Sequence, residues 1–296
     1  MTTAQLAAQS PAQALAPIHT LNLDGVSLRY RDTGGAGLPV LLSHGIGGSL
    51  ELWNRQFEHP RPGLRLVAWD MPSHGLSSSA PDDTHCEGIA HQGLRLLQAL
   101  EMGPAVLVGN SLGGMVSLRM AAQAPQQVRG LLLAACASLG REVMLPFRLM
   151  SLPGLGELMT RPGPMAVKQQ VASIVRKPES IPPEVLAAIE RNVMRPGGDK
   201  HFLALLRTVT GFTGHRVSAF QRSLDILRSF QGPVTFVHGE DDAVLQAAHS
   251  RQAHALVPGS ELVLLPGCGH TPQLEAAPAF QRALEALCQR VQASAR

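Results

Sequence analysis

A serine stands between two glycines in the segment 105–114, which reads AVLVGNSLGG. The residues before Gly109 are apolar and typical of a strand, whereas those after Ser111 have the apolar pattern of a helix. A serine at a tight turn between a strand and a helix presents its hydroxyl outward and can act as a nucleophile. Gly109 and Gly113 lack a Cβ, so the chain can turn sharply at their positions. The segment therefore predicts a nucleophilic Ser111.

A serine hydroxyl needs a general base near neutral pH, and the base needs a carboxylate that holds its tautomer and stabilises its charge. Two loops can supply these groups, because each follows an apolar run typical of a strand. Residues 238–242 read HGEDD, and residues 266–270 read PGCGH. His270 is the predicted base, since it ends a small-residue loop after the last strand. Asp242 is the predicted acid, and Asp241 is the alternative.

The remaining histidines lack such a setting. His44 follows a strand-like run and is expected to make structural hydrogen bonds, while His249 and His254 are expected on a surface helix. His215 and His238 have no partnering motif in the sequence. None of them is therefore predicted to act as the base.

The negative charge that develops on a carbonyl oxygen under attack requires two backbone N–H donors. We predict that Leu112, directly after the nucleophile, donates one and that Ile46 donates the other. Ile46 lies in the glycine-rich loop HGIGG at 44–48, in which Gly45 is predicted to support the turn. Such a loop can also cradle a phosphate, but no Gly-Lys-Ser/Thr follows it, which disfavours a nucleotide site of that type.

Composition and charge narrow the class of protein. The 296 residues are 45% hydrophobic and 16% charged with a formal net charge of +3, as in a soluble globular protein. The basic residues are scattered, so we expect neither a nucleic-acid nor a membrane partner. No residue cluster has metal-ligand spacing, and no metal or organic cofactor is expected. The cysteines form no C-x-x-C pair and the N-terminus lacks a secretion signal, which predicts a cytoplasmic protein.

Short apolar runs alternate with helix-like segments along most of the chain. Most runs are continuous, as expected of parallel strands covered by helices on both faces. The first two form a predicted hairpin through Asp24-Gly25, a dipeptide that suits a tight turn. The predicted strands are 19–23, 26–32, 40–43, 64–69, 105–108, 131–135, 234–237 and 262–265.

The strand rhythm stops after residue 137, where Pro and Gly separate short helix-like segments such as 184–193 and 201–210. Apolar residues between Met144 and Met159 could line a pocket there or serve local packing. The predicted organisation is a flexible leader at 1–17, a core at 18–137 and 226–296, and an inserted helical cap, or lid, at 138–225.

Three further segments, taken with the serine turn, resemble the α/β-hydrolase fold family: LSHGIGGS at 42–49, DMPSHGLS at 70–77 and GCGHTP at 267–272. The resemblance implies an α/β fold with a mostly parallel eight-stranded sheet, flanking helices and an inserted helical cap. Families of this pattern place the acid third after the glycine of the strand-end loop, which here is Asp242.

Within that family the chain is similar to capped serine hydrolases, which include carboxylesterases, 3-oxoadipate enol-lactonases and meta-cleavage-product C–C hydrolases. The resemblance implies a Ser-His-Asp triad that cleaves a small to medium apolar carboxylic ester through an acyl-enzyme. A lactonase or a C–C hydrolase is the alternative, since Asn110 before the serine resembles the C–C enzymes. Asn110 is also predicted to support the turn that carries Ser111.

Two features separate the chain from the C–C hydrolases. Thr271 stands where they usually have a tryptophan, and the loop around Ile46 differs from theirs. They also bind a substrate carboxylate with a cap arginine, for which Arg191 is the candidate. A non-catalytic ligand-binding protein on the same scaffold is least favoured, because every catalytic part has a candidate residue. A homo-oligomer is compatible with the sequence.

Overall fold

A central eight-stranded sheet organises the computed structural model, which describes residues 15–58 and 61–294. The strand order is β1-β2-β4-β3-β5-β6-β9-β10. The pairs β1–β2 and β2–β4 are antiparallel and all the others are parallel, which confirms the predicted sheet. Its strands are β1 (Ile18–Leu23), β2 (Val26–Asp32), β3 (Leu38–Ser43), β4 (Leu64–Trp69), β5 (Ala105–Asn110), β6 (Val128–Ala134), β9 (Val234–Gly239) and β10 (Glu261–Leu265).

The predicted hairpin between the first two strands is confirmed, because β1 and β2 pair through residues 24–25. Asp24 and Gly25 have φ values of 52° and 88°, in the left-handed region that this tight turn needs. The amide of Gly25 also donates to the side chain of Asn22 at 2.8 Å.

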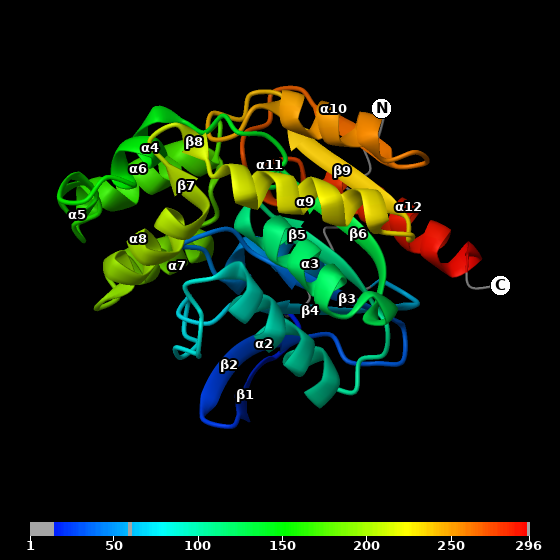
Figure 1. The fold of residues 1–296 in the computed structure, drawn as a ribbon. Coiled ribbons are helices and arrows are strands. Elements are labelled where there is room, and N and C mark those ends of the chain that lie inside the picture. Colours follow the sequence, from blue (N-terminus) through cyan, green and yellow to red (C-terminus); the bar gives the residue numbers. More distant parts are fainter. Residues whose placement is uncertain (1–14, 59–60, 295–296) are drawn as a thin grey trace, which may run out of the picture.

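Helices cover both faces of the sheet, and Figure 1 shows α2, α3 and α9 side by side on one of them. Leu41 and Leu107 belong to the core cluster on that side, whereas their neighbours Val40 and Val106 belong to the cluster on the other side, which includes residues of α12. Successive residues of a strand face opposite sides, so two buried faces require continuous apolar runs. The flanking helices are α1 (Asn54–Phe57), α2 (Cys86–Ala99), α3 (Leu112–Gln123), α9 (Val217–Ser229), α10 (Ala247–Leu256), α11 (Pro272–Glu275) and α12 (Ala277–Ala293).

A helix-rich insertion follows β6 and gathers at the left end of the molecule in Figure 1. Helices lie where the sequence predicts them at 184–193 and 201–210. The short hairpin β7–β8 was not predicted, because two-residue strands are too short to produce a strand pattern. The elements are α4 (Leu145–Met150), α5 (Leu155–Met159), α6 (Pro164–Ile174), α7 (Pro183–Val193), α8 (Gly198–Val209), β7 (Thr210–Gly211) and β8 (Gly214–His215).

The predicted boundary of the cap at residue 225 falls inside α9. Arg119 of α3 is buried and donates hydrogen bonds to Ser223 Oγ at 3.2 Å and to the Ala219 carbonyl at 3.3 Å. These contacts hold α9 against α3 from its first turn onward. The part of the insertion that lies away from the core layer is therefore shorter than 138–225.

Residues 1–14 of the predicted leader lie outside the described residues. Residues 15–17 are described, and they contact β2. Arg31 donates to the Ala16 carbonyl at 2.7 Å, and the amide of Asp32 donates to the Pro17 carbonyl at 3.3 Å. The last part of the predicted leader is thus bonded to the core.

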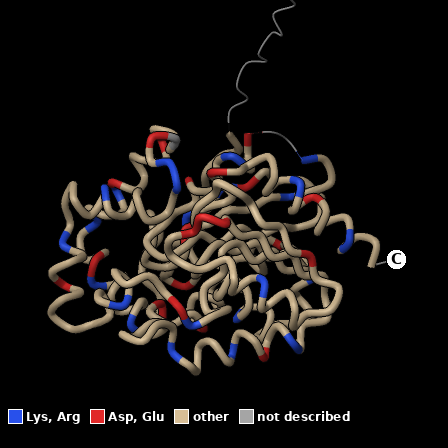
Figure 2. Tube along the Cα trace, turned by 90° about the horizontal axis from the view of Figure 1, so that it is seen from above, with Lys and Arg blue, Asp and Glu red and all other residues tan. Residues whose placement is uncertain are grey.

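Figure 2 shows Lys and Arg interspersed with Asp and Glu over the trace, in agreement with the small net charge. Among the helices that the structure describes, none combines the length and the apolar character needed to cross a bilayer.

Candidate active site

Ser111 occupies the turn between β5 and α3 with φ 55° and ψ −117°, a conformation that few side chains adopt. The glycines around it are required by close backbone contacts. A Cβ on Gly109 would lie 2.2 Å from the Gly113 carbonyl oxygen, and one on Gly113 would lie 2.1 Å from the Ser43 carbonyl oxygen. The turn is therefore packed directly against the end of β3, as the sequence pattern requires.

The two residues predicted to supply amide donors lie at the same pocket as Ser111. Ile46 and Leu112 line the same pocket as the serine, and neither amide donates to an acceptor within the described residues. A Cβ on Gly45 would lie 3.3 Å from the Ser111 Cβ, so the absence of a side chain lets this loop approach the serine. The arrangement offers two unpaired N–H groups near Ser111.

His270 and Asp242 are in direct contact. His270 Nδ1 lies 2.8 Å from Asp242 Oδ2, and the Asp242 side chain is fully buried. Burial by itself would raise the pKa of Asp242, but the nearby His270 ring and hydrogen bonds from His238 and His270 hold that pKa well below its usual range. The lowered pKa favours the ionised form of Asp242, and its carboxylate is in contact with the His270 ring.

Asp241, the alternative acid, points elsewhere. Its side chain is 46% exposed and lies 3.5 Å from Arg176 at the surface. The structure thus brings Asp242, and not Asp241, to His270.

Asn110 connects the serine turn to the histidine loop. Its Nδ2 donates to the His270 carbonyl at 2.9 Å and to the Ala134 carbonyl at 3.2 Å. Three segments that are far apart in the chain are joined by this one side chain. The predicted supporting role of Asn110 therefore has a structural basis.

His238 is a neighbour of the site that the sequence did not reveal. Its Nε2 lies 3.0 Å from Asp242 Oδ2, and its ring is fully buried. The only signal in the sequence is that His238 and Asp242 are four positions apart in the HGEDD segment. At the end of a strand, this spacing does not show whether the two side chains meet.

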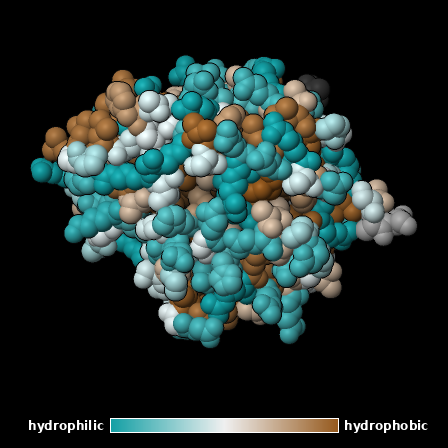
Figure 3. All heavy atoms as spheres, in the orientation of Figure 1, coloured by the Kyte–Doolittle hydropathy of each residue, from teal (hydrophilic) through white to brown (hydrophobic). Residues whose placement is uncertain are grey.

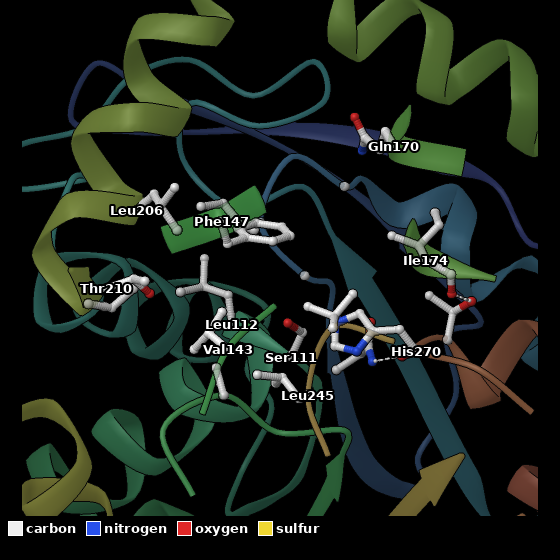
Figure 4. A pocket seen from close by; sticks show the side chains of 18 of the residues that line it. Ser111, Leu112, Val143, Phe147, Gln170, Ile174, Leu206, Thr210, Leu245 and His270 are labelled. Carbon is white, nitrogen blue, oxygen red and sulfur yellow. Dashed lines mark hydrogen bonds between the residues drawn. The ribbon is translucent and has the colours of Figure 1, made fainter. Parts of the chain in front are cut away.

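Ser111 and His270 border one pocket between the core and the insertion, and Figure 4 shows apolar side chains around them. Among the described residues, no Asp, Glu, Lys or Arg lines this pocket. Its wall is formed by Gly45, Ile46, Gly48, Leu52, Asn110, Ser111, Leu112, Ala137, Val143, Phe147, Gln170, Ile174, Leu206, Val209, Thr210, His215, Val244, Leu245, His270 and Thr271.

Most of the apolar residues between Met144 and Met159, which the sequence offers as candidates for a pocket wall, do not line this pocket. Of these residues, Phe147 lines the pocket. Leu145 and Leu158 are 55% and 56% exposed, and Figure 3 shows apolar atoms gathered over this end of the molecule. Amphipathic periodicity alone does not show which side of a short helix faces a pocket.

Arg191, the candidate carboxylate ligand, bonds to the core instead. It donates to Glu51 at 3.1 Å and to Ser49 at 3.3 Å. Burial would raise the pKa of Glu51, but hydrogen bonds from Arg29, Arg191 and Ser49 lower it to about 2. Arg191 is therefore occupied by a buried carboxylate and does not line the pocket.

His44 and His249 are two further histidines for which the sequence predicts no role as the base. His44 has the expected structural role, since its Nδ1 lies 2.7 Å from the Gly45 carbonyl and its Nε2 accepts from the Met71 amide at 3.1 Å. His249 lies on α10, a helix with an exposed outer side as predicted, but its own side chain is 2% exposed. The side of α10 that carries His249 packs inward.

Within the described parts of the chain, no group of three or more His, Cys, Asp or Glu side chains could hold a metal ion. The four cysteines are buried free thiols.

Comparison with known proteins identifies the family. A model of the alpha/beta hydrolase family matches residues 40–283, which is most of the chain. The protein therefore belongs to the alpha/beta hydrolase family, and this membership supports a hydrolase activity.

Relatives within the family have different reactions in their names. The dihydrolipoyllysine-residue acetyltransferase component of an acetoin cleaving system from Pseudomonas putida is 32% identical over 91% of this chain and 67% of its own. The 2-hydroxy-6-oxo-6-phenylhexa-2,4-dienoate hydrolase of Burkholderia cepacia is 26% identical over 89% and 92%. A solved thermophilic esterase from Thermogutta terrifontis has a TM-score of 0.72 at 24% identity, covering 94% and 99%. This last likeness shows the fold alone.

Proposed function

We propose that this protein is a serine hydrolase that cleaves carboxylic esters of small to medium apolar substrates, with Ser111, His270 and Asp242 as its triad. The observation that carries the proposal is the placement of Ser111 and His270 on one pocket, with His270 Nδ1 2.8 Å from buried Asp242. A nucleophile, a base and an orienting acid are the parts that acyl transfer needs.

In the proposed reaction, Ser111 Oγ attacks the carbonyl carbon while its proton passes to Nε2 of His270. Asp242 stabilises the imidazolium that forms, and the amides of Ile46 and Leu112 bind the oxyanion. His270 then gives the proton to the departing alcohol, which leaves the acyl group on Ser111. Water that is deprotonated by His270 attacks this acyl-enzyme and releases the acid.

The pocket wall supports a neutral substrate. A buried charged group without a partner costs several kcal/mol or shifts its ionisation. Because no charged side chain among the described residues lines the pocket, an ionised substrate would find no partner in the wall. Apolar side chains such as Phe147 and Leu206 fit a hydrocarbon acyl or alcohol group.

Hydrolysis of a C–C bond is the second candidate, and it is suggested by the dienoate hydrolase relative and by Asn110. The dienoate in that relative's name carries a carboxylate. Arg191, the candidate partner for such a group, is bonded to Glu51 and lies outside the pocket wall. These contacts favour an ester or a lactone over a dienoate.

The test is hydrolysis of p-nitrophenyl esters of increasing acyl length by the wild type and Ser111→Ala. We expect a nitrophenol burst and steady turnover in the wild type and a rate at least about 10³-fold lower in the variant. Ser117→Ala is the matched control, since Ser117 is a buried serine of α3 that does not line the pocket.

Activity that persists in Ser111→Ala would refute the proposed nucleophile. If a chromogenic ring-fission dienoate, followed by its loss of colour, is turned over faster than any ester, the assignment moves to C–C hydrolysis. Absence of turnover on every ester, lactone and dienoate would favour a binding role.

A further inference from the structure

Asp242 is contacted by a second histidine besides His270. Asp242 Oδ2 lies 2.8 Å from His270 Nδ1 and 3.0 Å from His238 Nε2. The His238 and Asp242 side chains are both fully buried. His238 does not line the pocket, so any effect that it has on the reaction passes through Asp242.

The neighbours of His238 assign its protons. Two acceptors surround Nε2, the Asp242 carboxylate and the Leu245 carbonyl oxygen at 3.0 Å, so this nitrogen carries a hydrogen. Nδ1 lies 2.8 Å from Oγ of Ser250, a hydroxyl that can donate to it. A ring with its hydrogen on Nε2 satisfies every one of these partners, because the two acceptors at Nε2 require that hydrogen and the Ser250 hydroxyl can donate to Nδ1.

Asp242 consequently accepts hydrogen bonds at both oxygens. Oδ1 accepts from the amides of Val244 at 2.7 Å and Leu245 at 3.0 Å, while Oδ2 accepts from the two histidines. A carboxylate whose charge is shared among several donors stabilises an imidazolium on one of them less strongly than a carboxylate with fewer donors. The same bonds prevent the carboxylate from rotating away from His270.

We propose that His238, whose ring is bonded by Ser250 at Nδ1 and by Leu245 at Nε2, is a positioning residue that orients Asp242 and limits how strongly Asp242 stabilises protonated His270. This inference rests on the triad proposed above. It differs from that proposal because His238 could be lost while the triad remains.

Other ionisable groups face the same cluster. His249 of α10 lies nearby and bonds to Glu142 at 2.9 Å. The Cys268 thiol faces it from the β10–α11 loop, and burial together with the negative charge of Glu275, Asp242 and Asp241 raises its pKa to about 12, so it stays neutral. None of these groups is itself altered by replacing His238.

The experiment follows the rate at which a fluorophosphonate labels Ser111 between about pH 5 and pH 9. Ser111 Oγ forms a bond to phosphorus, fluoride leaves, and the hydroxyl proton passes to His270, so the rate reports on the base without requiring the natural substrate. The variants are His238→Phe, which keeps a planar ring without a donor, and His238→Gln, which can place an amide N–H near the position of Nε2.

In His238→Phe we expect the acidic limb of the labelling profile to move to higher pH by about half a unit, because the Asp242 charge is then shared with fewer donors. The plateau rate should fall about tenfold, the scale of one lost charge-assisted hydrogen bond. His238→Gln should recover both values toward the wild type. A folded His238→Phe with the wild-type profile and only a lower Tm would overturn the proposal.

Ser250→Ala provides a second test of the proposal, which applies if His238→Phe does not fold. Loss of the hydroxyl removes the bond at Nδ1 and lets the His238 ring move relative to Asp242, so we expect a smaller shift of the acidic limb in the same direction. An unchanged profile would contradict the proposal. Labelling that survives in Ser111→Ala would instead refute the proposed function. Normal labelling of Ser111 with unchanged profiles in the His238 and Ser250 variants would refute this inference alone.

Discussion

Ser111 holds a backbone conformation that costs about 1–3 kcal/mol when a side chain is present. The surrounding chain holds the residue in this conformation. Its amide donates to the Ala134 carbonyl at 2.9 Å, and its carbonyl accepts from the Ala137 amide at 3.0 Å. Because β6 and the following loop supply both bonds, the strained turn is part of the sheet rather than a mobile loop.

The two neighbouring aspartates provide a test at the scale of single residues. Asp242→Asn should lower kcat by about 10⁴-fold, because the amide cannot stabilise the imidazolium of His270. Asp241→Asn should change kcat by less than about twofold, since its ion pair with Arg176 is exposed. Steady-state kinetics on the best p-nitrophenyl ester would measure both.

Circular dichroism spectra of the two variants should match the wild type, so that a loss of rate is not a loss of fold. Equal losses in both variants would contradict the assignment of Asp242 as the acid.

At the scale of elements, α3 begins against the backbone of β3. Gly113 lies in its first turn, where a helix would ordinarily favour alanine by about 1 kcal/mol. The Cβ of an alanine would, however, lie 2.1 Å from the Ser43 carbonyl and 2.6 Å from the His44 carbonyl. Backbone atoms cannot move aside as a flexible side chain can, so the clash outweighs helix propensity.

Gly113→Ala should therefore lower the free energy of unfolding by about 3 kcal/mol and displace Ser111 from the pocket. Urea unfolding and fluorophosphonate labelling would measure the two effects. Gly103→Ala is the matched control, because a Cβ at Gly103 meets no atom within 4 Å. A Gly113→Ala protein with the stability and labelling rate of Gly103→Ala would disprove the close packing of α3 on β3.

Across the whole molecule, half-buried arginines join the insertion to the core. Arg191 of α7 bonds to Glu51, and Arg195 donates to the carbonyls of Gly75 at 3.3 Å and Ser77 at 2.9 Å. The insertion is thus held over the pocket by directional bonds as well as by apolar contact. Removing one partner of a buried pair leaves the other uncompensated, which is costly.

Buried histidines make the stability of the whole fold depend on pH. Burial lowers the pKa of His215 from 6.5 to about 4, and it also lowers the pKa of His44 and His74. Between pH 6.5 and about 4 the unfolded chain binds more protons than the folded one, so stability is full above pH 6.5 and falls with decreasing pH. The His215 contribution is about 3 kcal/mol.

Urea unfolding between about pH 7.5 and pH 4 would measure this dependence. His215→Gln should show a shallower loss of stability over that interval, because its side chain does not titrate. At lower pH, the lowered pKa of Glu51 predicts a further loss of folding stability as the pH falls from 4.5 through about 2. A wild-type slope in His215→Gln would contradict the lowered pKa of His215.

The sequence by itself determined the features that depend on short stretches of chain. Continuous apolar runs located most strands of the sheet, because burial on both faces leaves few polar positions. The Asp24-Gly25 turn located the first two strands, whose sequences are not continuously apolar. Gly109, Ser111 and Gly113 predicted a turn whose backbone strain is local, although the contact that requires Gly113 is with the distant Ser43. The division into core and cap at 138–225 depends on longer stretches, and its end at 225 cut through α9.

Only the tertiary structure decided which side chains meet. Asp242 and His270 are separated by 28 positions, and the bond from Asn110 to the His270 carbonyl spans 160. Whether Asp241 or Asp242 faces the base, whether His238 joins them, and whether Arg191 reaches the pocket all depend on how distant segments pack. Backbone preferences are set by a residue and its near neighbours, whereas a buried polar side chain bonds to whichever distant group the fold brings within reach.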